Sequence, residues 1–291
     1  MDQIFNLPNT YQFEFLSMTR AETIIIYAFL GLIIGSFLNV VIYRLPKMIH
    51  SHWHEQALDF LEMPIKQDKG KISLLWPASH CPQCQHQIRV FENIPVISWI
   101  LLRRKCSACQ INIPIRYPAV EIISALLSAF VAYRFGPSAE GLLMLVVTFH
   151  LIIITAIDFD HQIIPDSLVL PLLWLVLICS VLGIFQPPSA AIIGAVVGYL
   201  CLWSVSKTYK LIRHVDGMGH GDFKLLAVFG AICGWQSVFI IVAVSAFVGL
   251  AFALPLLLKK ASMQTAIPFG PALAIAGWIT IIFDPLIDLN Y

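Results

Sequence analysis

Eight long apolar runs leave this 291-residue chain few folds other than a bundle of membrane helices. Apolar runs of about 17–25 residues are long enough to cross a bilayer as helices. Only 12% of the residues are charged, against about 25% in soluble domains. We therefore predict an all-α polytopic membrane protein with about eight transmembrane helices, at 21–44, 118–134, 140–157, 164–185, 189–206, 222–234, 237–258 and 265–285.

The basic residues predict how these helices are oriented. If the amino terminus lies outside, only Arg20 and Arg134 of the 18 Lys and Arg fall on the outer side. The other basic residues then fall in inner loops, as the positive-inside rule requires. They are Arg44, Lys47, Lys66, Lys69, Lys71, Arg89, Arg103, Arg104, Lys105, Arg116, Lys207, Lys210, Arg213, Lys224, Lys259 and Lys260. The acids of the carboxyl tail, Asp284 and Asp288, fall outside.

Composition also excludes some partners and processing steps. The net charge is +1 and no dense basic run is present, so we expect lipid around the helices and no nucleic acid partner. The first 20 residues have no basic segment leading into a short apolar stretch. We therefore expect no cleavable signal peptide.

Four cysteines lie in the one long polar segment, residues 45–117. Cys81 and Cys84 form one C-x-x-C pair, and Cys106 and Cys109 form another. This spacing is typical of a four-thiolate zinc site, and a reducing cytoplasm disfavours disulfides there. Because four thiolates close the coordination shell, the zinc would be structural. Redox exchange and a cluster without metal are the alternatives.

Other cysteines and histidines have simpler interpretations. Cys179, Cys201 and Cys233 lie singly in apolar runs, where free cysteine packs as a small hydrophobic residue. His80 and His86 flank the first cysteine pair and would compete as ligands, but we expect them to be exposed loop residues.

Two aspartates lie at the edges of apolar runs, where an ionisable side chain indicates function by default. Asp158 ends the third run, and Asp222 follows the glycine-rich stretch at 217–221. Two neighbouring carboxylates share a proton, which is the chemistry of aspartyl proteolysis. Glycines before an acid also let a peptide substrate approach the backbone closely. Both aspartates fall on the cytoplasmic face in the predicted topology, so we predict that Asp158 and Asp222 are catalytic.

We interpret the acidic and basic residues near Asp158 and Asp222 as structural rather than catalytic. We expect Asp160, His161 and Asp216 to be loop residues, Asp166 to begin a helix, and Lys224 to anchor at the inner membrane surface. A proton-coupled transporter also uses paired membrane carboxylates, but near the bilayer midplane. A membrane scaffold with a zinc domain for binding partners is a third interpretation.

Motifs along most of the chain resemble those of the prepilin peptidases, also called type IV leader peptidases. The resemblance begins in the first run, near residues 35–46, and includes both C-x-x-C pairs and residues 116–121. Asp158 with Ile164-Pro165-Asp166 is similar to the first catalytic segment of this family. Gly217-x-Gly219-x-Gly221-Asp222-x-Lys224 is similar to the second. Pro268-Phe269-Gly270-Pro271 also fits the family, near the start of the last span.

The resemblance implies a bifunctional enzyme of the bacterial inner membrane. Such an enzyme removes the basic leader from type 4 prepilins and pseudopilins after a glycine, on the cytoplasmic side. It then methylates the new amino terminus with S-adenosylmethionine. The sequence contains no Rossmann-type glycine fingerprint, so we assign no residue to the methyl donor, and a peptidase without methylation is the alternative.

These interpretations divide the chain into three parts. Residues 1–44 would form an N-terminal segment and the first transmembrane helix. Residues 45–117 would form a small cytoplasmic zinc domain, and residues 118–291 the transmembrane aspartyl peptidase domain.

Overall fold

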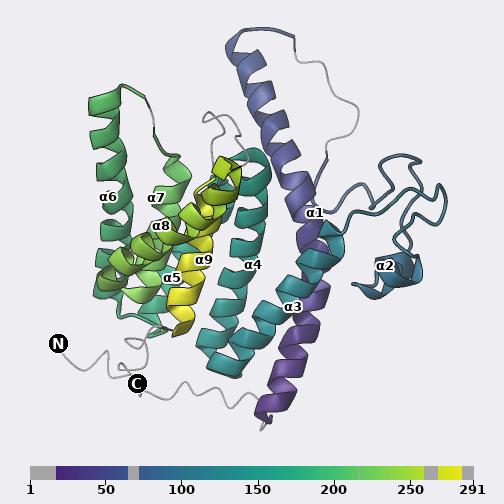
Figure 1. Ribbon diagram of the computed structural model, residues 1–291, viewed down its shortest axis with the longest axis horizontal. Coiled ribbons are helices and arrows are strands. Elements are labelled where there is room, and N and C mark those ends of the chain that lie inside the picture. Colours follow the sequence, from purple (N-terminus) through teal and green to yellow (C-terminus); the bar gives the residue numbers. More distant parts are fainter. Residues whose placement is uncertain (1–17, 65–71, 216, 259–267, 284–291) are drawn as a thin grey trace.

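A computed structural model describes residues 18–64, 72–215, 217–258 and 268–283, and this part of the chain is a helical bundle (Figure 1). One long helix corresponds to each of the eight predicted runs. These helices are α1 (Arg20–Phe60), α3 (Arg116–Phe135), α4 (Ala139–His161), α5 (Asp166–Val181), α6 (Pro188–Arg213), α7 (His220–Cys233), α8 (Trp235–Leu258) and α9 (Gly270–Phe283). Two short helices, the 3₁₀ turn η1 (Val90–Asn93) and α2 (Ile97–Leu101), lie in the polar segment.

Five of these helices are long and apolar enough to cross a membrane: α1, α3, α4, α6 and α8. Helices α5 and α9 are apolar but shorter. The predicted class, an all-α polytopic membrane protein with a four-cysteine cluster between the first two long helices, is confirmed.

Helix α1 is longer than the apolar run that predicted it. A capping box between Thr19 and Glu22 begins the helix, which continues past residue 44 to Phe60. Pro46 lies inside α1, where it removes the hydrogen bond to the carbonyl one turn earlier and crowds that carbonyl, yet the helix continues. No glycine follows Pro46 before Phe60, so no other strong helix breaker ends the helix sooner. The far end of α1 therefore projects beyond the bundle (Figure 1).

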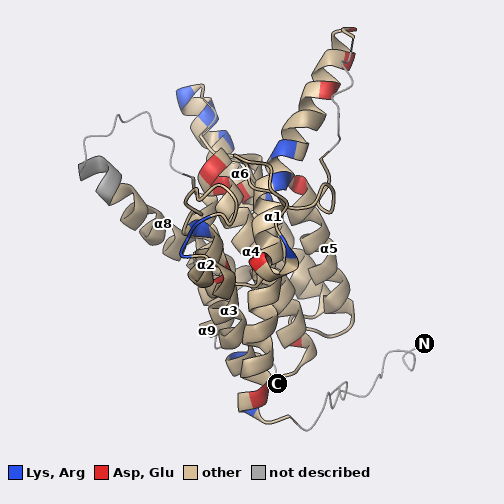
Figure 2. Cartoon of the chain, turned by 90° about the vertical axis from the view of Figure 1, so that its right-hand side faces the viewer, with Lys and Arg blue, Asp and Glu red and all other residues tan. Residues whose placement is uncertain are grey.

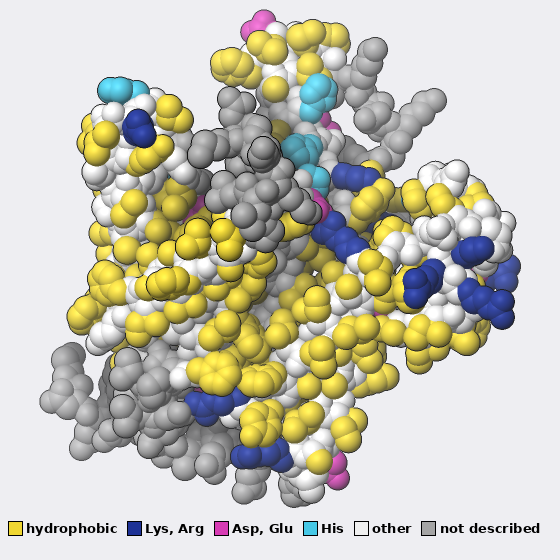
Figure 3. Space-filling model, viewed as in Figure 1, with side chains coloured by type: hydrophobic (Ala, Val, Ile, Leu, Met, Phe, Trp, Pro, Cys, Tyr) yellow, Lys and Arg dark blue, Asp and Glu magenta, His cyan; other side chains and the backbone are white. Residues whose placement is uncertain are grey.

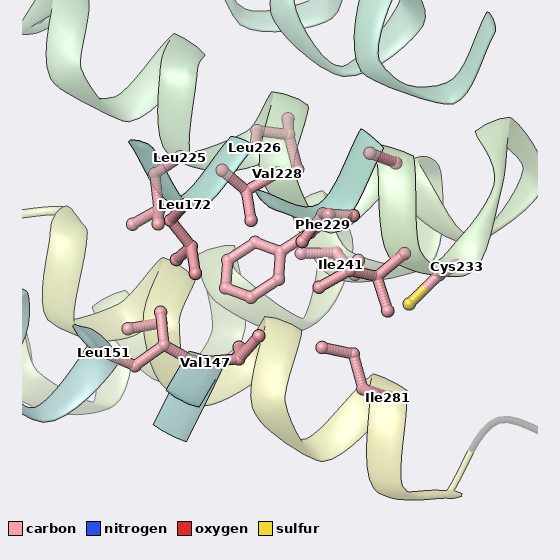
Figure 4. Packing of buried hydrophobic residues seen from close by; sticks show 14 of the residues in the cluster. Val147, Leu151, Leu172, Leu225, Leu226, Val228, Phe229, Cys233, Ile241 and Ile281 are labelled. Carbon is pink, nitrogen blue, oxygen red and sulfur yellow. The ribbon is translucent and has the colours of Figure 1, made fainter. Parts of the chain in front are cut away.

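Helix α7 lies buried at the centre of the bundle. Because neighbouring helices surround it, a helix of only 14 residues is sufficient here. It packs against α5, α6, α8 and α9. Phe229 is fully buried and lies among side chains of α4, α5, α8 and α9 (Figure 4). On the other side, a Cβ on Gly194 of α6 would come within 1.9 Å of the Gly230 carbonyl oxygen. These two helices are therefore packed backbone to backbone, as small residues allow between membrane helices.

Charge and apolar surface separate along the bundle. Hydrophobic side chains cover most of the middle of the molecule on the face shown in Figure 3. Lys, Arg, Asp and Glu gather mainly toward the end where α1 and α6 project (Figure 2). Some charged residues named in the sequence analysis lie outside the described residues: Lys66, Lys69, Lys71, Asp216, Lys259, Lys260, Asp284 and Asp288.

Candidate active site

Asp158 lies in the last turn of α4 and is held by the beginning of α9. Asp158 is buried, with 5% of the residue exposed to solvent. The backbone N–H of Gly270, the first residue of α9, donates a hydrogen bond of 3.0 Å to Oδ2 of Asp158. A buried carboxylate is costly unless such a donor stabilises it. Asp158 is thus positioned by a contact across 112 residues of sequence.

Asp222 lies in the first turn of α7, behind the N-cap residue Gly219. Its residue exposure is 7%, and Oδ1 is buried without a hydrogen-bond partner in the described structure. A Cβ added to Gly219 would lie 3.6 Å from Oδ2 of Asp222, so the carboxylate turns back toward the N-cap. The positive end of the helix favours a carboxylate here, by about 0.3–1 kcal/mol in exposed cases.

The two carboxylates share one buried neighbourhood. Among the described residues, no hydrogen bond joins the two carboxylates directly. Ile164, in the connection from α4 to α5, fills the space between Gly270, which binds Asp158, and Gly221, which precedes Asp222. A Cβ on Gly221 would lie 2.5 Å from the Ile164 Cβ, and a Cβ on Gly270 would lie 3.0 Å from its Cδ1. The beginnings of α7 and α9 and the end of α4 therefore converge on one point.

Two ion pairs connect this site to its surroundings, and sequence reasoning missed both. Nζ of Lys224, two residues after Asp222, lies 2.5 Å from Oδ1 of Asp166 at the start of α5. Asp166 does begin a helix as predicted, but it also holds Lys224. Arg116 of α3 pairs with Asp160 and donates to the carbonyl of Ala156 at 3.3 Å. The expectation that Asp160 and His161 are loop residues was wrong, because both lie in the last turn of α4; Asp160 is exposed, and its partner Arg116 lies 44 residues away in sequence.

The four cysteines between α1 and α3 form a compact cluster. Their sulfurs all lie within 4.8 Å of one another, and none is in a disulfide. The Cys81–Cys109 and Cys84–Cys106 sulfur distances are 3.8 Å and 4.0 Å. A tetrahedral ion with Zn–S bonds of about 2.3 Å requires sulfurs about 3.8 Å apart. The donor set and its spacing therefore fit a zinc ion.

The two C-x-x-C pairs have the same backbone turn. In each, the first cysteine donates its N–H to a carbonyl five residues later, at 2.9 Å in both cases. Each first cysteine is buried and each second one is exposed. Backbone N–H groups of Cys84 and then of Gln83 lower the pKa of the Cys81 thiol to about 6.

The flanking histidines do not belong to this cluster; His80 is exposed, as expected, whereas His86 is only partly exposed and its Nε2 is buried. His86 lies 3.4 Å from a carboxylate oxygen of Glu92, and His80 faces the carbonyl of Ala78. Among the described residues, the cluster contains only the four cysteines.

The cysteine segment is fastened to the membrane bundle by buried polar contacts. Arg44 of α1 is buried and donates to three carbonyls, those of Ser73, Leu74 and Pro77, at 2.6–3.3 Å. On the other side of the cluster, the N–H of Val96 donates at 2.7 Å to the buried Glu121 of α3. The cluster thus has a fixed position on the α1–α3 pair, near the end of α4 that carries Asp158.

Comparison with known proteins identifies this combination of sites. Residues 29–135 match the Bacterial Peptidase A24 N-terminal domain, and residues 145–254 match the Type IV leader peptidase family. The chain belongs to the type IV leader peptidase family.

Relatives in this family match nearly the whole chain. The chain is 49% identical over 279 residues to the prepilin leader peptidase/N-methyltransferase of Stutzerimonas stutzeri, covering 96% of both chains. It is 47% identical over 263 residues to the protein of that name in Pseudomonas aeruginosa, covering 90% of this chain and 91% of the relative. For the Neisseria gonorrhoeae protein of that name the identity is 43%, over 91% of this chain and 92% of the relative. No solved structure matches the chain.

The regions that match the two family models contain the residues of both candidate sites. The span matched by the leader peptidase family contains both Asp158 and Asp222. The span matched by the N-terminal domain contains all four clustered cysteines. Gly270, which lies beyond both spans, had no role in the sequence interpretation, although it belongs to the Pro268–Pro271 motif.

Proposed function

We propose that the chain is a membrane aspartyl endopeptidase whose Asp158 and Asp222 remove the leader from type 4 prepilins and pseudopilins after a glycine. In the proposal, the enzyme also methylates the new amino terminus, with S-adenosylmethionine as methyl donor. The observation that supports the peptidase assignment is that two buried carboxylates lie at the ends of two helices, beside glycines that both pack against Ile164, in a leader peptidase family chain.

The mechanism follows from the two protonation states of the pair. One carboxylate is ionised and takes a proton from a water molecule as the water oxygen attacks the scissile carbonyl. Its partner donates a proton to the carbonyl oxygen, giving a neutral diol. The first group then returns its proton to the leaving nitrogen as the C–N bond breaks. The second group recovers a proton from a diol hydroxyl, so the pair ends as it began.

A transporter is the weaker candidate because of where the carboxylates lie. Proton-coupled transporters place such groups near the bilayer midplane. Here Asp158 is three residues from the end of α4, and Asp222 is two residues from the start of α7. A site at helix ends suits a substrate with a polar leader outside the membrane and an apolar helix within it.

We place the active site at the cytoplasmic face of the bacterial inner membrane. The positive-inside rule supports this orientation. Lys210 and Arg213 lie in the last turn of α6 and Lys224 lies two residues after Asp222, whereas Arg134 lies in the last turn of α3, at the end opposite to Arg116, which pairs with Asp160. The division into an N-terminal part to residue 44, a zinc domain at 45–117 and a peptidase domain at 118–291 is part of this proposal.

The cysteine cluster has a structural role in the proposal. Cys81, Cys84, Cys106 and Cys109 would hold one zinc ion, which would join the two C-x-x-C turns. Four sulfur ligands leave no open position for a water molecule, so hydrolysis takes place at the aspartates.

A cleavage assay tests the proposal. Full-length protein in detergent is incubated with a prepilin, with and without S-adenosylmethionine, and the products are identified by mass spectrometry. The parent should cut after the glycine and, with the methyl donor, add one methyl group. Asp158→Asn and Asp222→Asn should each abolish cleavage while circular dichroism shows the parent helix content. Cleavage at the parent rate by either variant contradicts the assignment.

A further inference from the structure

We infer that Gly270 is a positioning residue that gives the two aspartates different roles. Its N–H holds Asp158 as the base and leaves Asp222 as the acid. The inference rests on the proposed peptidase function and deepens it. It assigns a role to the Pro268–Pro271 motif, which the mechanism above does not use.

The contact at Gly270 has room for no other residue. Its N–H donates to Oδ2 of Asp158 at 3.0 Å. A Cβ at this position would come within 2.6 Å of the same oxygen and 3.0 Å of Cγ. The backbone therefore approaches the carboxylate as closely as a hydrogen bond requires, and only glycine leaves the space free.

Helix α9 is held in place so that this contact is maintained. The Trp278 ring N–H donates at 3.0 Å to the Thr148 hydroxyl, which ties α9 to α4. Thr148 and Asp158 belong to the same helix, and Trp278 and Gly270 to the other. The N–H of Leu273 closes the first turn of α9 by donating to the carbonyl of Phe269 at 3.0 Å. The N–H of Gly270 remains free for Asp158.

Asp222 has the opposite environment. Its Oδ1 is buried without a partner, so nothing described in the structure donates to it. The start of α7 favours a negative charge on Asp222, but that influence is spread over the first turn. A direct N–H to a carboxylate oxygen is the stronger stabilisation of charge. When only one of the two can ionise, the charge falls on Asp158 and the proton on Asp222.

Other charged and titratable groups around Asp158 are engaged elsewhere. Arg116 of α3 holds Asp160. Lys224 of α7 holds Asp166 of α5. The rings of His50 of α1 and His161 of α4 pack edge to face, with centroids 6.1 Å apart. The described part of α9 carries no charged side chain, and His220 of α7 packs against Phe223. These contacts leave Asp222 as the charge partner of Asp158.

The assignment fixes the direction of each proton transfer. Asp158 takes the proton from the attacking water and later gives it to the leaving nitrogen. Asp222 gives its proton to the carbonyl oxygen and recovers one from the diol hydroxyl. At the end of the cycle Asp158 is again ionised and Asp222 again protonated.

Two variants at residue 270 distinguish the loss of the N–H donor from the addition of a Cβ. Gly270→Ala adds a Cβ and keeps the N–H, whereas Gly270→Pro adds a Cβ and removes the N–H. Proline is tolerated at the first position of a helix, so the second change suits this site. Gly249→Ala is the control for loss of a glycine, because a Cβ there would meet only Ala272, at 3.7 Å.

The readout is the pH profile of kcat/KM for a synthetic prepilin peptide that spans the leader junction. Relative to the parent, the acidic limb should move to higher pH in both Gly270 variants, and in Gly270→Pro by about one unit, a tenfold loss of rate on that limb. The Gly249→Ala profile should coincide with the parent. Movement of the alkaline limb alone would reverse the two roles, and profiles of both Gly270 variants that coincide with the parent would remove Gly270 from the mechanism.

A second measurement does not depend on activity and serves if the proline variant does not fold. With ¹⁵N-glycine labelling, the Gly270 amide resonance should shift strongly in Asp158→Asn and less in Asp222→Asn. Equal shifts in the two variants, or none in either, overturn the inference. Failure of the proposed function looks different: the parent does not cleave the peptide, or the two Asn variants do.

Discussion

Nζ of Lys224 lies 2.5 Å from Oδ1 of Asp166, which joins the segment after Asp222 to the start of α5. This ion pair fixes the connection that carries Ile164, and Ile164 packs against both Gly221 and Gly270. The pair therefore supports the geometry of the candidate active site from outside it.

Breaking the pair should reduce cleavage more than stability. The Lys224 side chain is 24% exposed and the Asp166 side chain 58%, so solvent screens the pair and its loss should cost under about 1 kcal/mol of unfolding free energy. In Lys224→Met we expect kcat/KM to fall by about tenfold, because Asp222 and Ile164 lose their alignment. The charge-reversed double variant, Lys224→Asp with Asp166→Lys, should recover most of the rate. A double variant no better than the single ones would show that the pair itself does not matter.

The two glycines before Asp222 should differ in tolerance. A Cβ on Gly221 would lie 2.5 Å from the Cβ of Ile164, and neither atom can rotate away. A Cβ on Gly219 would meet only Oδ2 of Asp222, at 3.6 Å. Gly221→Ala should therefore lower the stability by about 1–3 kcal/mol and cleavage by about 100-fold, while Gly219→Ala keeps most of both. Initial rates and thermal unfolding in detergent check this order, and equal losses would contradict the close packing of Ile164 against Gly221.

Zinc content should depend on the cysteine quartet alone. We expect about one zinc per chain in the parent and a large loss in Cys81→Ser with Cys106→Ser, because two ligands are removed from a closed shell. Cys179→Ser is the control, since this cysteine lies in α5, away from the cluster. Elemental analysis of purified protein measures the ratio. Unchanged zinc in the double variant would mean that the metal lies elsewhere.

Arg44 should hold the cysteine segment on α1. Its guanidinium satisfies three carbonyls that no other described side chain reaches, so Arg44→Met should cost about 2–3 kcal/mol. Arg44→Lys should recover part of this, because one ammonium cannot match the fork of the guanidinium. Limited proteolysis should cut the segment before Cys81 faster in Arg44→Met than in Arg44→Lys. Equal resistance of the parent and Arg44→Met would rule out this role.

Much of the fold was predictable because it depends on local pattern. Apolar runs predicted all eight long helices, and two C-x-x-C pairs predicted the cluster of sulfurs. The end of α1 was missed because helix formation beyond residue 44 does not require an apolar sequence. The catalytic assignment of Asp158 and Asp222 stays a prediction, and the structure adds that both are buried, beside glycines that pack against the same residue, Ile164.

The missed parts of the site depend on contacts between distant residues. Lys224 and Asp166 are 58 residues apart, and Gly270 and Asp158 are 112 apart. Alone, Lys224 is interpreted as a membrane anchor and Asp166 as the start of a helix. Only the packing of α4, α5, α7 and α9 brings them together. The one signal in the sequence was that each lies within a motif similar to the leader peptidase family.

Cross-linking tests most directly whether the end of α4 meets the start of α7. Cysteines replace Asp158 and Asp222 in a background without the three single membrane cysteines, and a short bifunctional thiol reagent is added. Proteolysis between the helices then shows whether they remain joined. We predict that this pair is linked and that a control pair, Glu140→Cys with Asp222→Cys, is not, since Glu140 lies at the far end of α4. If the thiols at 158 and 222 both react with a monofunctional reagent but never cross-link, the shared site is contradicted.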